Sequence, residues 1–377
     1  MREYLLVLFV AAATTYLLGG LVRRFASRIG AYTPIRDTDM HSVPIPRLGG
    51  LALLLGLCAS LMVATNLPFL GSIPEVSGDA WAILAAGAVM ALVGGIDDVV
   101  DLDPITKLAG QLVAAGIVVV AGIQLQWIPL PNSEVLSLGT ALSALITTLA
   151  IVGAANAVNF VDGLDGLAAG IVGIGAAAFF LYSYLFAFLN PDYSLNRAMT
   201  PALITAALTG ACLGILPHNG YPARVFMGDS GAFLLGTLLA SSTISFTGWL
   251  DPGVVAASAN TGGSLLPALL PLIVPFAALA LPFTDMLLAV IRRTRKGLSP
   301  MSARDTQHLH HRMIRIGHSH PRAVLVMYLW TGLIAFGVIL IGLDPSWERG
   351  AVVAGSAAIV VALTVLIPRG RRVPETR

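Results

Sequence analysis

The sequence predicts an all-α membrane protein that crosses the bilayer many times, and its composition and its apolar stretches predict this class. Of its 377 residues, 56% are hydrophobic and 11% are charged, whereas soluble domains carry about 25% charged residues. The apolar residues are gathered into stretches separated by polar loops. Because a helix needs roughly 20 apolar residues to cross the hydrocarbon core, the pattern predicts about 10 to 11 membrane-spanning helices.

The predicted spans follow one another along the whole chain. They cover residues 4–21, 48–65, 81–96, 108–123, 138–155, 167–189, 201–216, 231–249, 266–290, 322–343 and 351–367. The longest hydrophilic stretch, 292–321, is interpreted as a His-rich cytoplasmic loop, and 368–377 as a basic cytoplasmic tail. We therefore expect residues 1–377 to form a single integral-membrane domain.

Basic residues are distributed unevenly between alternate loops. Of the 22 Lys and Arg residues, only Arg2, Arg197 and Arg349 fall in one set of loops, and the others fall in the opposite set with all 7 histidines. Cytoplasmic loops carry an excess of Lys and Arg. The bias predicts that the N-terminus lies outside, that the C-terminus lies in the cytoplasm, and that the cytoplasmic face is the active one. Since the charges follow the first apolar stretch, that stretch is expected to be an uncleaved anchor.

Two adjacent carboxylates, Asp97 and Asp98, close the third predicted span. The C-terminal end of a helix disfavours negative charge, and ionisable groups at membrane level are costly. The pair therefore requires a cation, either Mg2+ or a nearby Lys, unless both are solvated loop acids. Asp103 has a simpler interpretation, since Asp before Pro104 is typical of a helix N-cap followed by Pro.

A second polar run contains two asparagines and two aspartates between predicted spans. Asn156 and Asn159 are three residues apart, as are Asp162 and Asp165, so each pair shares a face if the run is helical. Capping of the next span by Asp165 is the alternative. One cap does not require four such residues, so the run favours a binding role.

A third run contains Phe226, Gly228, Asp229 and Gly231. Asp229 is placed equally well to cap the following helix. The flanking glycines, however, permit close approach of the backbone to a phosphate, and Phe226 offers a face on which a base can stack.

A fourth run, His308, His310, His311 and Arg312, is a dense set of donors suited to a diphosphate or a sugar. A transition-metal site is the alternative. Both cysteines, however, lie in predicted spans and are interpreted as packing residues.

Two weaker features complete the set of candidates. The segment 44–50 combines prolines with Arg47 and two glycines at a helix entrance, and it carries little information alone. Asp285, inside the ninth predicted span, is a candidate buried acid, although it could simply pair with a basic neighbour.

Together these runs resemble the polyprenyl-phosphate N-acetylhexosamine-1-phosphate transferases, which include the WecA/TagO-type enzymes and MraY. The resemblance covers nearly the whole chain and rests on four motifs in order: Asp97-Asp98 followed by Lys107-Leu108 and Gln111, the run 156–166, the run 226–231 and the run 308–312. The His-x-His-His-Arg form and the segment 46–50 are similar to the N-acetylglucosamine branch rather than the muramoyl-pentapeptide branch.

The resemblance implies an enzyme that transfers N-acetylglucosamine 1-phosphate from UDP-N-acetylglucosamine to undecaprenyl or decaprenyl phosphate and releases UMP. This would be the first membrane step of cell-envelope glycan synthesis, with the active site on the cytoplasmic face of the bacterial inner membrane. The expected cofactor is Mg2+, with Mn2+ as an alternative. The expected partners are the nucleotide sugar, the lipid carrier and the membrane, without nucleic acid, and a homodimer is left open.

The resemblance also implies a role for each matching residue. Asp97 and Asp98 would act on the prenyl phosphate as the catalytic pair, Asp229 and Asn159 would hold the metal, and Lys107 would neutralise the prenyl phosphate. The remaining assignments are nucleotide contacts for Phe226, Asp165, Asp162 and Asn156, and sugar or diphosphate contacts for His308, His310, His311 and Arg312.

The sequence leaves two alternative functions open. The first is a phospho-N-acetylmuramoyl-pentapeptide transferase, which has the same chemistry with a different donor. The second is a transporter of anionic lipids or nucleotides, which predicts polar groups near mid-span and a repeated half. Because the polar runs collect on one face and no repeat is evident, the sequence favours an enzyme.

Overall fold

A computed structural model gives the structure of the chain. It describes residues 1–32, 44–129, 135–189, 196–248, 270, 273–274, 276–277, 279–295, 297, 309–343 and 346–366. Predictions that concern other residues, including His308 and the tail 368–377, stay predictions.

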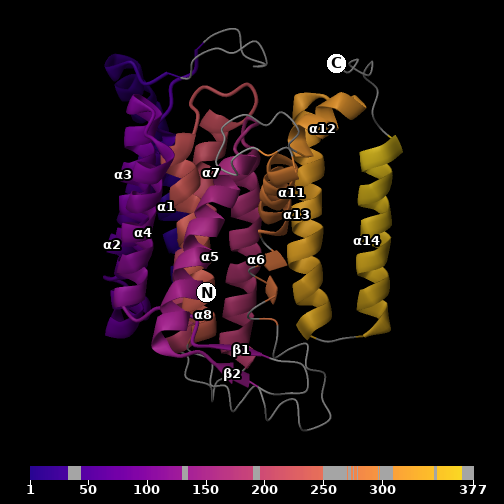
Figure 1. Cartoon of the computed structure of the whole chain (residues 1–377). Helices are drawn as coiled ribbons and strands as arrows, with labels where there is room; N and C mark the ends of the chain where they lie inside the picture. Colours follow the sequence, from indigo (N-terminus) through magenta and orange to yellow (C-terminus); the bar gives the residue numbers. More distant parts are fainter. Residues whose placement is uncertain are drawn as a thin grey trace.

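The described chain is a bundle of helices (Figure 1). The helices are α1 (Arg2–Ile29), α2 (Gly49–Ala64), α3 (Pro74–Val100), α4 (Pro104–Val120), α5 (Thr140–Val161), α6 (Leu167–Leu189), α7 (Asn196–Asn219), α8 (Gly228–Gly248), α11 (Ala280–Arg295), α12 (Leu309–Ile316), α13 (His320–Leu343) and α14 (Trp347–Leu366). A 3-10 helix, η1 (Leu70–Ser72), follows α2. The predicted all-α, multi-pass class is thus confirmed in outline.

Fewer long spans are described than the sequence predicts. Eight helices are long and apolar enough to cross a membrane, namely α1, α3, α5, α6, α7, α8, α13 and α14. The second and fourth predicted spans are the shorter helices α2, with 16 residues, and α4, with 17 residues. The ninth, 266–290, lies partly outside the described residues, so a total of eleven stays a prediction.

Helix α2 begins one residue after the start of its predicted span, whereas α4 begins at Pro104, before its predicted span 108–123. In α4 the predicted cap is confirmed, since the Asp103 carboxylate accepts the amides of Ile105 and Thr106 at 3.0 and 3.1 Å, and Pro104 is the first helical residue. In α2 the chain enters through Leu48, whose φ is 76°, before Gly49 starts the helix.

One small sheet departs from the all-α prediction. Strands β1 (Trp127–Pro129) and β2 (Val135–Ser137) pair antiparallel, with Ile128 opposite Leu136. The strands lie between two predicted spans, and three-residue strands are too short to show an alternating pattern in the sequence. The hairpin lies beside the ends of α5 and α8 that are remote from the polar site (Figure 1).

Helix α8 is the central element of the bundle. The side chains from Ser230 to Thr247 are all buried, and α8 packs against α2, α3, α5, α6 and α7. By contrast, α14 has a single buried residue, Val360, and packs against α13 at the periphery. The first turn of α8 is therefore held by several helices at once, and this is where the polar residues gather.

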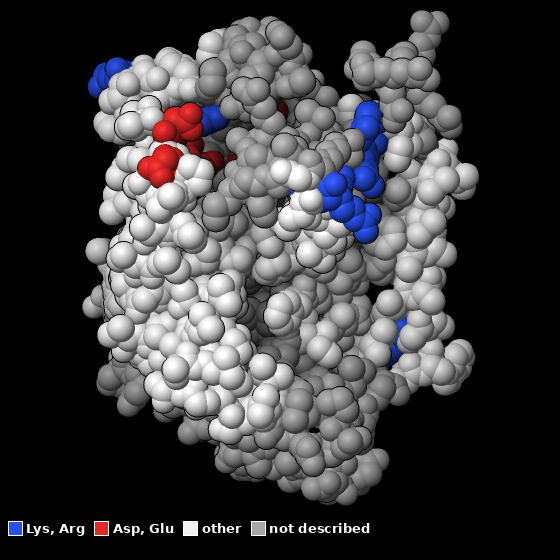
Figure 2. Space-filling model, in the orientation of Figure 1, with Lys and Arg blue, Asp and Glu red and all other residues white. Residues whose placement is uncertain are grey.

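Different local contacts are found at the two ends of the bundle. Near the start of α1, the Glu3 carboxylate accepts the amides of Phe69 and Leu70 at 2.9 and 2.8 Å. Near the end of α14, the Thr364 carbonyl lies 2.9 Å from the His318 ring nitrogen. Most charged side chains visible in Figure 2 lie close to the end that carries α12, above a largely uncharged flank. Which end faces the cytoplasm stays a prediction.

Candidate active site

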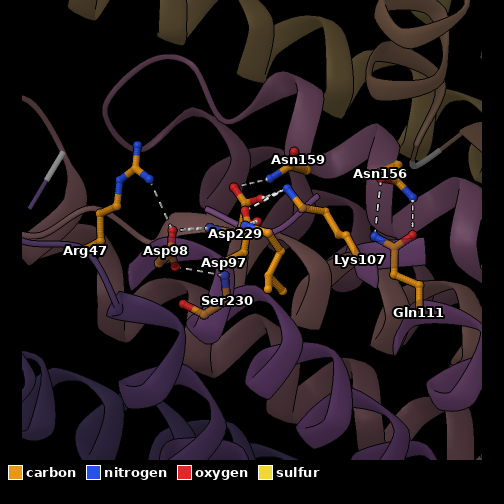
Figure 3. A network of polar contacts seen from close by, with 10 residues as sticks. Arg47, Asp97, Asp98, Lys107, Gln111, Asn156, Asn159, Asp229 and Ser230 are labelled. Carbon is orange, nitrogen blue, oxygen red and sulfur yellow. Dashed lines mark hydrogen bonds and ion pairs between the residues drawn. The ribbon is translucent and has the colours of Figure 1, made fainter. Parts of the chain in front are cut away.

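Three carboxylates meet where α3 ends and α8 begins. Asp97 and Asp98 lie in the last turn of α3, and Asp229 lies in the first turn of α8 (Figure 3). Close approach of the two helices depends on Gly94, because a methyl group at this position would overlap the backbone of Asp229 and Ser230. The structure thus brings together acids that are more than a hundred residues apart in the sequence.

Asp98 accepts hydrogen bonds from the start of α8. Its two oxygens lie 3.1 Å from the Asp229 nitrogen and 3.2 Å from the Ser230 nitrogen, and the Arg47 guanidinium is 3.6 Å away. The first amides of a helix lack partners within the helix and carry positive partial charge. The N-terminus of α8 therefore compensates for the unfavourable position of Asp98 at the C-terminal end of α3.

Asp97 is neutralised by a different group. Its Oδ2 lies 2.7 Å from Lys107 Nζ, and its Oδ1 accepts the Leu102 amide at 2.9 Å. The same ammonium lies 3.1 Å from Asp229 Oδ2. The nearby lysine considered for this pair lies beside Asp97, and the other cation considered, Mg2+, stays a prediction. Lys107 thus binds two carboxylates at once, and its proposed contact with a prenyl phosphate is not tested by this geometry.

Asn159 and Asn156 occupy different positions on α5. Asn159 donates to Asp229 Oδ1 at 2.8 Å and belongs to the carboxylate cluster. Asn156 donates instead to Gln111 Oε1 at 2.8 Å, and Gln111 is buried. The two asparagines therefore separate into a cluster member and an amide pair beside it (Figure 3). The nucleotide contact predicted for Asn156 stays a prediction.

The two aspartates that follow α5 also differ. Burial, together with the negative charges of Asp229 and Asp98, raises the pKa of the Asp162 carboxyl to about 8. The nucleotide contact predicted for Asp162 stays a prediction. Asp165 is buried and its carboxylate accepts the Ala223 amide at 2.9 Å. The two roles considered for Asp165, a cap of the next helix and a contact with a nucleotide, both stay predictions.

The segment around Phe226 is fixed by the loop before α2. Phe226 donates its amide to the Pro46 carbonyl at 2.8 Å and accepts the Gly49 amide at 2.9 Å, while Gly50 donates to the Met227 carbonyl at 3.0 Å. At Gly50, a methyl group would overlap the Gly231 backbone. The segment 44–50, weak as a sequence signal, is thus part of the site.

Arg47 is the site residue with the weakest signal in the sequence. In Figure 3, Arg47 and Lys107 approach the carboxylates from opposite sides. The Arg47 side chain is 26% exposed, so it borders both the buried acids and solvent. A basic residue followed by two glycines was the available signal, but nothing local related it to Asp98, 51 residues later.

Replacing Arg47 with Gln should lower turnover about tenfold, because a charged partner of a buried carboxylate contributes more than a neutral hydrogen bond. The exposed Arg28 in the last turn of α1 provides the matched control, and Arg28→Gln should stay within about twofold of wild type. Both effects are measured as initial rates of the transferase reaction that the motifs predict, on purified and folded variants. Equal rates for the two variants would remove Arg47 from the site.

The His-rich run is described only in part. Helix α12 begins at Leu309, so the backbones of His310 and His311 are helical, and Arg312 is exposed. His308 lies outside the described residues. The sugar and diphosphate contacts predicted for these four residues stay predictions.

Among the described residues, no group of three His, Cys, Asp or Glu side chains is arranged to hold a metal ion. The oxygens of Asp97 and Asp229 nevertheless converge on a single cation, the Lys107 ammonium. Mg2+ prefers such oxygen ligands, usually one or two carboxylates together with substrate phosphates. The donor chemistry therefore fits the expected ion, with the carboxylates now neutralised by lysine.

The fold and the site define a class, that of multi-pass membrane proteins with an acidic cluster at one end of the bundle. Residues 80–247 match the family model described as "Glycosyl transferase family 4". Relatives match far more of the chain, and one of them is 41% identical over 99% of it. The chain belongs to this family, and the superfamily that the motifs indicate is confirmed.

Three relatives illustrate the range of similarity. The 41% identical relative is the "Decaprenyl-phosphate N-acetylglucosaminephosphotransferase" of Mycobacterium tuberculosis, of which 90% is covered. A "Probable undecaprenyl-phosphate N-acetylglucosaminyl 1-phosphate transferase" of Bacillus subtilis is 30% identical, over 92% of this chain and 87% of the relative. A "Phospho-N-acetylmuramoyl-pentapeptide-transferase" of Mycolicibacterium vanbaalenii is 31% identical, over 65% of this chain and 77% of the relative.

Proposed function

We propose that the protein transfers N-acetylglucosamine 1-phosphate from UDP-N-acetylglucosamine to a polyprenyl phosphate and releases UMP. The observation that carries this proposal is the 41% identity, over 99% of the chain, with an enzyme named for that reaction on decaprenyl phosphate. The muramoyl-pentapeptide relative matches only 65% of the chain, so the N-acetylglucosamine donor is preferred.

In the proposed reaction, an oxygen of the prenyl phosphate attacks the β-phosphorus of the nucleotide sugar. A new oxygen–phosphorus bond forms while the bond between the β-phosphorus and the bridging oxygen breaks, and that oxygen leaves with UMP. Both substrates are anionic, so the task is mainly positioning and charge neutralisation. Phosphate oxygens are already ionised near neutral pH, and removal of a proton contributes little.

The cluster suits this task because it holds two cations beside three acids. Lys107 and Arg47 flank the carboxylates, and we assign Lys107 to the prenyl phosphate. Lys107 must then exchange one of its carboxylate contacts for the phosphate. Asp97 and Asp98 orient the attacking phosphate, and Phe226 stacks on the uracil ring.

We assign Asp229 and Asn159 to Mg2+, with Mn2+ as an alternative. Mg2+ supplies a positive charge that polarises a phosphoryl oxygen and stabilises the leaving group. Asn159 and Lys107 both contact Asp229 in this structure, so the chain already orients this carboxylate for a cation.

We place the enzyme in the bacterial inner membrane, with the carboxylate cluster on the cytoplasmic face. The support is the distribution of Lys and Arg between alternate loops together with the positive-inside rule. A nucleotide sugar made in the cytoplasm would then reach the site without crossing the membrane. The reaction would be the first membrane step of cell-envelope glycan synthesis.

The test is release of UMP by purified protein in detergent, with polyprenyl phosphate and either UDP-N-acetylglucosamine or UDP-muramoyl-pentapeptide. We expect turnover with the first donor, a complete loss of turnover after EDTA, and recovery on addition of Mg2+. Turnover that survives EDTA would refute the metal assignment alone. Turnover with only the pentapeptide donor would correct the sugar.

The transporter alternative is separated by the same preparation placed in sealed vesicles. A transporter moves intact donor or lipid across the bilayer and releases no UMP. If folded wild type releases no UMP with either donor, the transferase proposal fails and transport becomes the working hypothesis.

A further inference from the structure

The helix that carries the His-rich run is capped by an acid from another helix. Helix α12 has 8 residues and begins at Leu309. The Leu309 amide donates to Asp285 Oδ1 at 2.8 Å, and Asp285 lies 24 residues earlier, in α11. The first amides of a helix have no partner within the helix, and a carboxylate is favoured there by the helix dipole. Asp285 thus performs the task of an N-cap from outside the helix.

Asp285 is placed where an acid is costly. It is only 1% exposed, and burial of a carboxylate costs free energy unless hydrogen bonds compensate. An apolar residue would pack in α11 at a lower cost. The presence of an acid is therefore explained by what it binds, and one of its partners is the start of α12.

Helix α11 contacts α5, the helix that carries Asn159, as well as α12. Its buried residues are Pro282, Asp285, Ala289 and Arg293, and this spacing places them on one stripe of the helix. The Arg293 guanidinium lies 5.2 Å from the centroid of the Phe160 ring. Phe160 directly follows Asn159 in α5. One face of α11 therefore touches both the segment that contains Asn159 and the start of α12.

Apolar packing holds the same three segments together. Leu309 and Leu281, from α12 and α11, pack against a cluster that contains Val161, Leu164 and Leu167. These three residues flank Asp162 and Asp165 in the sequence. The first turn of α12 is thus fixed by a hydrogen bond to α11 and by apolar contact with the loop after α5. In Figure 1, α11 and α12 lie beside α13.

We propose that Asp285 is a positioning residue that sets the His-rich helix α12 against the carboxylate cluster by capping its first amide. This inference rests on the proposed function, because it assumes that His310, His311 and Arg312 contact the sugar or diphosphate of the donor. Asp285 itself touches no substrate. Its removal should therefore weaken binding of the donor more than it slows the chemical step.

Two substitutions separate the acceptor oxygen from the charge. Asp285→Asn keeps an oxygen that can accept the Leu309 amide, since Asn caps helices about as well as Asp. Asp285→Ala removes the oxygen. Hydrogen–deuterium exchange should be about fivefold faster or more in 309–316 for Asp285→Ala and close to wild type for Asp285→Asn. In the same variants, KM for UDP-N-acetylglucosamine should rise about tenfold for Asp285→Ala and less than threefold for Asp285→Asn.

Glu3 provides a matched control at the other end of the bundle. Its carboxylate also accepts amides at the start of a short helix, those of Phe69 and Leu70. Glu3→Ala should speed exchange in 69–72 and leave KM unchanged. A change of KM in Glu3→Ala as large as in Asp285→Ala would show that loss of any cap disturbs the enzyme, and would overturn the proposal.

Two further results would also overturn it. One is unchanged exchange in 309–316 in Asp285→Ala. The other is an equal rise of KM in Asp285→Asn and Asp285→Ala, which would assign the effect to charge. Exchange needs no turnover, so it tests the cap even if wild type releases no UMP. If wild type releases no UMP, the proposed function fails. The exchange rates in 309–316 still show whether Asp285 caps α12.

Discussion

Replacing Asp229 with Asn should abolish turnover, with a loss of about 100-fold or more. The Asp229 carboxylate accepts from Asn159 at 2.8 Å and from Lys107 at 3.1 Å, and its own amide donates to Asp98 at 3.1 Å. Asn has the same shape, so the fold should survive. The substitution removes the negative charge that binds Lys107 and the proposed metal ion, and through them the substrates.

The control for this prediction is Asp101→Asn. Asp101 is an exposed acid just after α3, with φ of 58°, a conformation that Asn also accepts. We expect its rate to stay within about twofold of wild type. The test compares the rates of UMP release of Asp229→Asn, Asp101→Asn and wild type, provided that all three have the same elution profile and melting temperature. If Asp229→Asn keeps more than a tenth of wild-type activity, Asp229 is not the central carboxylate of the site.

Replacing Gly94 with Ala should remove most activity and lower the melting temperature, whereas Gly95→Ala should be nearly neutral. A methyl group at Gly94 would overlap the backbone of Asp229 and Ser230, so α8 would have to move away from α3. At Gly95 the nearest atom, Leu48 Cδ2, is 3.7 Å from the added carbon, which is an ordinary contact. Overpacking of this kind typically costs about 1–3 kcal/mol.

The two glycines are neighbours on the same helix, so each serves as the control for the other. Ala is the better helix former by about 1 kcal/mol, and this gain acts equally at both positions. The expected difference therefore reports contact with α8 alone. Melting curves in detergent and rates of UMP release measure it. Similar behaviour of the two variants would mean that α3 and α8 are not held as closely as the structure has them.

Much of the fold could be predicted from the sequence because spanning a membrane is a local property. Length and hydropathy alone identify α1, α3, α5, α6, α7, α8, α13 and α14 as spans. The cap of α4 by Asp103 was also predictable, since cap and helix are adjacent. The strands β1 and β2 were missed because they are three residues long.

The sequence predicts which residues form the site but not how their side chains pair. The motifs identify Asp97, Asp98, Asn159 and Asp229 as candidates, and these are the residues that the structure brings together with Lys107. The same sequence spacing relates Asn156 to Asn159 and does not reveal that Asn156 pairs with Gln111. Partners of that kind come from a neighbouring helix, and the sequence carries no distance between helices.

The sequence by itself determined the membrane class, the family and the residue types of the site, since all three depend on composition and on local motifs. Only the tertiary structure decided how the acids are neutralised. Asp98 is compensated by the start of α8 and by Arg47, and Asp97 by Lys107. The physical reason is that charge compensation acts over a few ångströms in space, and packing of helices brings groups to that distance regardless of their separation in the chain.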